Sequence, residues 1–107
     1  MSKKKIYNKH FDKGKFYLHS DKKGGHPAYL YKKRDKNNEY YLVLFSSSNG
    51  SGRKRLRHSI EPRKVKTSYV RSFPVVSKRR DLGKNVLNRL KIHKEDKPLI
   101  KVIERKK

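Results

Sequence analysis

The stretch EYYLVLFSS, residues 39–47, is the most apolar segment of this chain, and it restricts the possible folds more than any other feature. Its aromatic and aliphatic residues are followed by the Ser, Asn and Gly of residues 47–52, a composition typical of a strand that ends in a loop. We therefore expect residues 39–47 to form the central strand of a sheet.

Four other runs are typical of short strands. They are residues 15–20, 27–32, 53–58 and 68–76. Pro74 interrupts the last run, and because proline cannot donate a hydrogen bond to a sheet, it marks an edge or a bulge there. Five short strands so close together predict a mainly β fold, a small barrel.

The C-terminal part of the chain changes to a helical period. Leu82, Val86 and Leu90 are spaced by four residues, and they predict a short helix. Asp96 stands two residues before Pro98, which is typical of a helix that begins with an Asp cap and carries Pro in its first turn. The apolar residues that follow Pro98 fit a strand equally well. The sequence therefore predicts C-terminal helical elements behind the strands.

The 107 residues fit a single domain, and the 32% hydrophobic content supports only a small core. Residues 1–12 and residues 105–107 are charge-rich with little periodicity, which indicates a basic flexible arm and a basic tail. We expect the folded domain to span residues 13–104, and we expect a homodimer interface to add to its stability.

The charge of the chain is strongly unbalanced. Lys and Arg number 32 against nine Asp and Glu, which gives a formal net charge of +23. Self-repulsion of this size favours a polyanionic partner, and nucleic acid is the first to consider. An anionic membrane surface is the rival, but the chain has no apolar run of about 20 residues and no basic helix with a bulky apolar face. We therefore expect a nucleic-acid partner and no membrane.

Cysteine and histidine usage restricts the chemistry further. The chain has no Cys, which excludes disulfides, zinc knuckles and thiol catalysis. Its five His residues do not fall at helical metal spacing and have no carboxylate cluster near them in the sequence, so we expect no metal site and no cofactor. The N-terminal MSKKKIYNKHF lacks the apolar segment of a secretory signal, and we expect a cytoplasmic protein.

Three blocks, DKGKFYLHSD, GGHPAYLY and YYLVLFSSS, follow one another in the chain, and SYVRSFPVVSKRRDLGK comes after them. In this order they resemble the PemK/MazF/Kid family of small toxin ribonucleases. That family has a strand opened by Lys/Arg-x-Gly-x-aromatic, a loop ending in Gly-x-Arg-Pro, a central strand ending in Thr or Ser, and a strand leading through a basic turn into a helix. The resemblance covers residues Asp12 to Ile103. It implies an SH3-like barrel with C-terminal helical elements, a homodimer and an acidic antitoxin protein as partner.

The resemblance also implies a metal-independent endoribonuclease that cuts single-stranded RNA through attack by the neighbouring 2′-hydroxyl. Such a reaction needs a base, an acid and positive charge beside the phosphorane. His26 takes the place of the family's Arg in Arg-Pro, and because a neutral His accepts a proton, it is either a base or a phosphate ligand. Ser47 falls at the strand end, where it would hydrogen-bond the scissile phosphate. Arg71 falls where some members carry a strand arginine that stabilises the transition state.

A basic segment gives a signal that does not depend on the resemblance. In an alternating strand, Arg53, Arg55 and Arg57 share one face, and arginine donates in a planar fork that suits phosphate. Together with the basic turn at residues 78–80, this row predicts a groove for a nucleic-acid backbone. Tyrosines would stack on unpaired bases, which favours single strands or RNA, and the alternative for them is packing in the core or a dimer interface. The candidate nucleic-acid-binding residues are Lys22, Lys23, Tyr29, Tyr31, Arg53, Arg55, Arg57, His58, Lys78, Arg79 and Arg80.

Two other functions fit the same composition. One is a non-catalytic nucleic-acid-binding protein, such as an accessory protein or an inhibitor that masks a nucleoprotein. The other is a ribosome-associated basic protein. Both predict salt-dependent binding without cleaved products, whereas the ribonuclease predicts cleavage.

Overall fold

The computed structural model describes residues 11–21, 24–34, 39–63 and 66–106 of the chain. Its elements are β1 (Phe16–Asp21), β2 (Gly24–Arg34), β3 (Glu39–Ser46), β4 (Arg53–Arg55), β5 (Tyr69–Arg71), β6 (Val75–Lys78), the 3-10 helix η2 (Arg79–Asp81) and α2 (Lys97–Glu104). The strands form one six-stranded sheet in which every pairing is antiparallel. The expectation of a mainly β fold is therefore confirmed, and the C-terminal helical elements amount to one short α-helix within the described residues.

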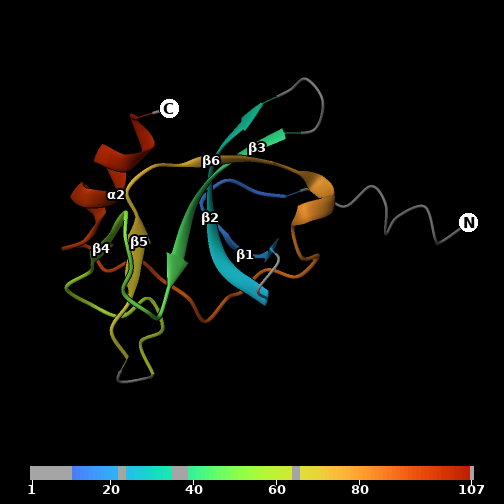
Figure 1. Cartoon of the computed structure of the whole chain (residues 1–107). Helices are drawn as coiled ribbons and strands as arrows, with labels where there is room; N and C mark the ends of the chain where they lie inside the picture. The colour runs from blue at the N-terminus through green and yellow to red at the C-terminus, as the bar shows by residue number, and fades with distance from the viewer. Residues whose placement is uncertain (1–10, 22–23, 35–38, 64–65, 107) are drawn as a thin grey trace, which may run out of the picture.

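Strand β3 is the centre of the sheet (Figure 1). One of its edges pairs with β2, with Ala28 opposite Leu44. Its other edge is shared, because β6 pairs with residues 39–42 and β5 pairs with residues 45–46. The strand expected at the centre from its composition is thus the one that three neighbours contact.

Both faces of β3 are buried, and each contributes to a separate apolar cluster. Leu42 and Leu44 belong to one cluster, which we call the β6-side cluster. Val43 and Phe45 belong to the other, which we call the α2-side cluster. The buried members of the β6-side cluster are Phe11, Tyr17, Ala28, Leu30, Leu42, Leu44 and Leu82. Those of the α2-side cluster are Phe16, Val43, Phe45, Leu56, Ile60, Val70, Leu90, Ile100 and Ile103. The middle of β3 has no solvent-facing side, so residues that bind a ligand must lie at its ends or on its neighbours.

The run expected as one strand at residues 68–76 is divided in two. Strand β5 ends at Arg71 and β6 begins at Val75, with the buried Pro74 between them. The break expected at Pro74 is confirmed, since proline has no N–H to continue a ladder. The division lets β5 and β6 pair with opposite ends of β3.

The helix expected from Leu82 to Leu90 is wrong. This segment runs along the outer edge of β1, where the Gly83 N–H donates to the Leu18 carbonyl at 2.7 Å and the Leu87 N–H donates to the Phe16 carbonyl at 2.9 Å. Two of its backbone donors therefore bind β1, and the hydrogen bond within the segment, from the Leu90 N–H to the Leu87 carbonyl at 3.2 Å, closes a single turn. Leu82 packs in the β6-side cluster and Leu90 in the α2-side cluster, so the spacing of four reflects two separate anchoring points.

Helix α2 begins where Asp96 and Pro98 indicate, and the alternative strand is excluded. Ile100 and Ile103 are buried in the α2-side cluster, while Val102 on the outer side is exposed. Figure 1 shows α2 beside β4 and β5. No helix in the described part of the chain is long and apolar enough to cross a membrane.

Residues 1–12 were expected to form a basic arm, but Phe11 and Asp12 belong to the folded domain. Phe11 is only 3% exposed, and its ring lies edge-on to those of Tyr17 and Tyr40, with centroids 4.9 and 5.4 Å away. The Asp12 N–H donates to the Tyr17 hydroxyl at 2.8 Å. The folded domain therefore includes Phe11, and residues 1–10 lie outside the described residues. At the other end, Arg105 and Lys106 are exposed as expected for a basic tail, and residue 107 is also outside the described part.

Candidate nucleic-acid interface

The short strands β4 and β5 carry four polar side chains on one face. Arg53 lies opposite Arg71 and Arg55 lies opposite Tyr69 in the antiparallel register. Directly opposite residues share a face, and the alternate residue Val70 is completely buried in the α2-side cluster. These four residues, Arg53, Arg55, Tyr69 and Arg71, therefore lie on the opposite face, and we call them the arginine face.

No acidic residue in the described part of the chain neutralises the positive charges of the arginine face. Arg55 and Arg71 are exposed and make no side-chain hydrogen bond or ion pair with any described residue. The Arg53 guanidinium donates to neutral groups, the carbonyl of Ser48 at 2.8 Å and its hydroxyl at 3.2 Å. Like charges directly opposite one another destabilise a strand pair, so an anion bound between Arg53 and Arg71 would relieve the repulsion.

The loop after β3 is held against this face. The Ser46 hydroxyl accepts the Ser48 N–H at 3.1 Å, and the Gly52 carbonyl accepts the Ser72 N–H at 2.9 Å. Gly52 has a φ of 74°, a left-handed conformation that glycine adopts without strain. These bonds position Arg53, which follows Gly52 directly, close to the end of β3.

The serine cluster contributes to the face through Ser46 more directly than through Ser47. Ser46 is the last residue of β3 and pairs with Tyr69. Ser47, the residue predicted from the sequence, lies one position beyond the strand and is exposed. Both lie beside the arginine face, and the register places the Ser46 side chain on it.

His26 lies in β2 opposite His19 and is half-buried. It alternates with Ala28, which packs in the β6-side cluster and pairs with Leu44 of β3. Since Phe45 pairs with Val70, Arg71 lies on the same face of the sheet as Leu44, and hence as His26. One strand separates them, so the strand spacing puts the two backbones roughly 10 Å apart. The structure thus places His26 and Arg71 on one face of the sheet, with Ser47 just beyond the end of β3, the strand between theirs.

The tyrosines predicted to stack on bases lie elsewhere. Tyr29 and Tyr31 pack against the α2-side cluster, on the face opposite to Arg71, with the Tyr29 ring 5.3 Å from Phe16 and the Tyr31 ring 6.1 Å from Tyr41. Burial raises the pKa of both phenols, and that of Tyr31 reaches about 12. Their positions therefore support the alternative role, packing. The aromatic residue on the arginine face is Tyr69, which the register identifies and the sequence pattern did not.

The predicted row of three arginines is two residues long, because β4 ends at Arg55. Beyond it, Leu56 is buried, and the N–H groups of Arg57 and His58 donate to the carboxylate of Asp96 at 2.9 and 3.0 Å. Arg57 is exposed but lies outside the strand pair. The strand alternation therefore does not carry it onto the arginine face.

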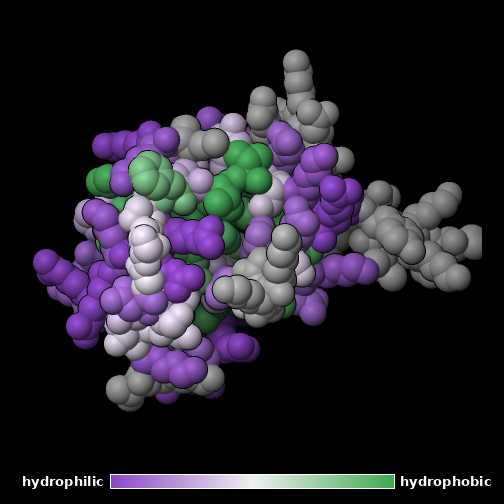
Figure 2. Space-filling model, in the orientation of Figure 1, coloured by the Kyte–Doolittle hydropathy of each residue, from purple (hydrophilic) through white to green (hydrophobic). Residues whose placement is uncertain are grey.

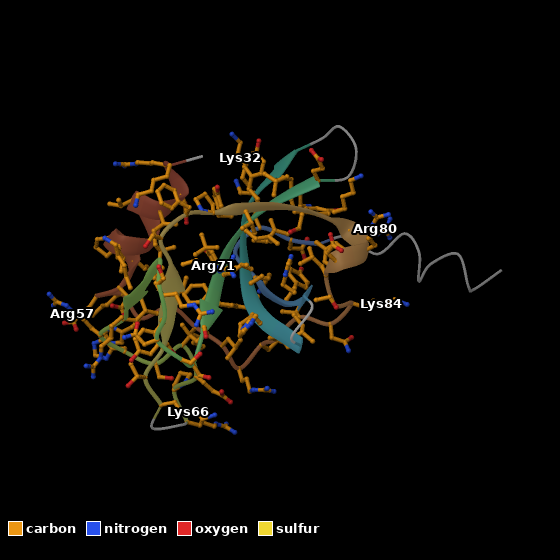
Figure 3. All side chains as sticks on the ribbon, viewed as in Figure 1. Lys32, Arg57, Lys66, Arg71, Arg80 and Lys84 are labelled. Carbon is orange, nitrogen blue, oxygen red and sulfur yellow. The ribbon has the colours of Figure 1, made fainter. Side chains whose placement is uncertain are left out.

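The second basic segment does not continue the first. Figure 3 shows Arg71 in the middle of the view, Arg57 at one side and Arg80 at the other, with Lys66 below. Lys78, Arg79 and Arg80 belong to the end of β6 and η2, where Lys78 and Arg80 are exposed. They form a separate basic area, and hydrophilic side chains border most of this side of the molecule (Figure 2). Lys22 and Lys23 lie outside the described residues.

His58 has a different environment from the one expected. Its ring stacks on that of His93, and its Nε2 lies 2.6 Å from Glu95 Oε1. The sequence argument against a metal site compared spacings along the chain, and so it missed groups that come together from distant segments. The only local signal was the spacing of His93 and Glu95, two residues apart.

No family model, curated protein or solved structure matches this chain. The arguments for its function therefore depend on its own residues and their geometry.

Proposed function

We propose that this protein binds single-stranded RNA across the arginine face. The observation that carries the proposal is the pairing of Arg53 with Arg71, next to Arg55, with no acidic partner for any of them among the described residues. A phosphate group between two guanidinium forks satisfies donors that the fold leaves open. The net charge of +23 adds a long-range attraction for any polyanion.

The shape of the face favours a single strand. It is only two short strands wide, and Tyr69 provides an aromatic ring beside the arginines. Base stacking on such a ring requires unpaired bases, and the wide minor groove of duplex RNA presents none. The exposed Phe73, just after β5, extends the apolar surface available to a base, and Lys106 Nζ lies 4.7 Å from its ring centroid.

We further propose that the fold is an SH3-like barrel of the PemK/MazF/Kid type, and that the bound RNA is cleaved. The central position of β3 and the passage of residues 82–87 along the free edge of β1 support a barrel. In the cleavage step, neutral His26 takes the proton of the attacking 2′-hydroxyl as the 2′-oxygen bonds to phosphorus, and Arg71 stabilises the phosphorane. The P–O5′ bond then breaks to leave a 2′,3′-cyclic phosphate, the leaving 5′-oxygen takes a proton from water, and His26 returns its own proton to the solvent. Ser47, with Ser46, hydrogen-bonds the phosphate. A homodimer would double the length of the interface, and an acidic antitoxin would compete with RNA for it.

The binding test compares wild-type protein with the double variant Arg53→Ala/Arg71→Ala on a fluorescent single-stranded RNA at several salt concentrations. We expect at least about a tenfold loss of affinity, and a salt slope smaller by about 1.4, which corresponds to two phosphate contacts. Arg89→Ala is the control, because it removes a cation that already pairs with Glu61 at 3.2 Å. An equal loss in the control variant would show that only net charge matters and would refute the interface.

The cleavage test incubates a long mixed-sequence RNA with the protein in EDTA, beside the His26→Ala variant, and maps the product ends. Discrete cuts carrying 2′,3′-cyclic phosphate, lost in the variant, would establish the ribonuclease. Intact RNA that nevertheless shifts in a gel would leave the alternative, a non-catalytic nucleic-acid-binding protein. Cuts that persist in His26→Ala would remove His26 from the mechanism.

A further inference from the structure

A cluster of three potential metal ligands lies beyond the end of β4, and its members come from two distant segments. The His58 and His93 rings are stacked, with centroids 3.6 Å apart and an interplanar angle of 20°. Glu95 Oε1 lies 2.6 Å from His58 Nε2, and the Glu95 N–H donates to His93 Nδ1 at 3.1 Å. One donor atom from each of the three side chains lies within 4.8 Å of the others. We call these three residues the histidine cluster.

The backbone under the cluster is held on both sides. Asp96 is only 4% exposed, and its carboxylate accepts the N–H groups of Arg57 and His58. Further along, the Lys91 N–H donates to the Ile60 carbonyl at 2.8 Å. These bonds fix residues 57–60 to residues 91–96 independently of the histidine and glutamate side chains. The backbone of the site is therefore already in place, and only the side chains have to turn when a ligand arrives.

We propose that His58, His93 and Glu95 bind a divalent transition metal ion, Zn²⁺ being the best match. Two imidazoles and one carboxylate are the protein ligands of open zinc sites, which keep a fourth position for water or substrate. Zinc bonds of about 2.0–2.2 Å place tetrahedral donors roughly 3.4 Å from one another. His58 Nε2 and Glu95 Oε1, now 2.6 Å apart, therefore have to separate slightly, and donors as much as 4.8 Å apart have to approach by about an ångström.

Metal binding must open the histidine stack, because a metal lies in the plane of each imidazole that binds it. The side chains of His58 and Glu95 are 40% and 51% exposed, so both have room to turn. A pocket of about 580 Å³ borders both histidines and leaves access to the fourth position.

The same surroundings predict which metals bind. The pocket also contains Arg55, Arg57 and Lys66, which repel a cation held by charge alone. Mg²⁺ and Ca²⁺ require several oxygen ligands, and the cluster offers one carboxylate. Imidazole nitrogens suit Zn²⁺, Cu²⁺ and Ni²⁺. Binding should therefore be selective for these three and undetectable for Mg²⁺ and Ca²⁺.

The test titrates untagged, metal-free protein with Zn²⁺ by calorimetry, and with Co²⁺ to record the visible absorption of a four-coordinate site. We expect one equivalent to bind, and His93→Ala and Glu95→Gln each to weaken binding by at least about tenfold. The matched controls, His26→Ala and Glu61→Gln, remove the same groups elsewhere and should bind like the wild type. Equal affinity in His93→Ala and wild type, or an equal loss in a control, would overturn the proposal.

A second measurement keeps the result independent of variant folding. In the wild-type protein, Zn²⁺ should shift the nuclear magnetic resonance signals of the His58 and His93 rings and leave those of His19 and His26 unchanged. Shifts at other histidines, or none at all, would refute the site. RNA plays no part in either measurement, so the outcome is separate from that of the RNA-binding test.

Discussion

The arginine face and the histidine cluster lie at the two ends of the same segment, residues 53–58. They differ in whether their basic side chains have an acidic partner. On the arginine face, Arg53 opposes Arg71, and no acid among the described residues pairs with them. At the histidine cluster, Glu95 pairs with His58, and Asp96 binds the backbone beneath it. The chain has only nine acidic residues, and two of them are used at this one place. The fold thus uses these two acids where distant segments are held together, and the described residues provide no acidic partner for the arginine face.

The largest expected effect comes from removing the Asp96 carboxylate, which holds the backbone beneath the histidine cluster. Asp96→Ala leaves two backbone N–H groups without their carboxylate acceptor, and we expect a loss of about 2–4 kcal/mol in the free energy of unfolding, measured with urea. Asp96→Asn keeps one acceptor oxygen and should lose about half as much. An unchanged free energy of unfolding in Asp96→Ala would show that the Asp96 carboxylate does not hold residues 57–58 against residues 91–96.

A smaller effect of opposite sign is expected on the arginine face. Arg71→Thr removes one of two opposed charges from a strand, so we expect a gain of about 0.2–1 kcal/mol at low salt, even though RNA affinity falls. In 1 M salt, where the Debye length is about 3 Å, the gain should disappear. Lys54→Thr is the control, because Lys54 opposes Val70 and not a cation. An equal gain in both variants would contradict a specific repulsion between Arg53 and Arg71.

The smallest effect concerns an acid that neither region uses. Burial raises the pKa of Glu104 more than the charges of Lys101 and Lys13 lower it. Its contribution to stability is therefore fully present below the pKa of the unfolded chain and is lost as the pH rises through the folded value. We expect Glu104→Gln to raise the Tm slightly at pH 7 and to leave it unchanged near pH 3, where both side chains are neutral. A lower Tm at pH 7 would show that the lysines dominate.

Features that depend on neighbouring residues were predicted well. The composition of residues 39–47 indicated the central strand, Pro74 indicated the break after β5, and Asp96 with Pro98 indicated the start of α2. Each of these follows from local chemistry, namely strand composition, a missing N–H and a preferred first helical turn. Even so, the Asp96 side chain does not cap its own helix, because its carboxylate binds the backbone at residues 57–58.

Features that depend on distant partners were predicted less well. Leu82 and Leu90 had helical spacing, but the segment between them donates backbone hydrogen bonds to the edge of β1 and does not form a helix. Tyr29 and Tyr31 were predicted to stack on bases, but in the sheet their side chains pack against the α2-side cluster. His26 and Arg71 lie on the same face of the sheet, one strand apart, and no sequence pattern specified the register from which this could be predicted.

The sequence by itself determined that the protein is strongly basic, mainly β and organised around residues 39–46, because net charge is a sum over residues and strand formation follows local composition. Only the tertiary structure decided that Arg53 opposes Arg71 and that His58 meets His93 and Glu95. Both arrangements depend on strand register and on contacts between distant segments. A shift of one residue in that register would turn the arginines to the other face, and nothing within residues 53–58 alone specifies it.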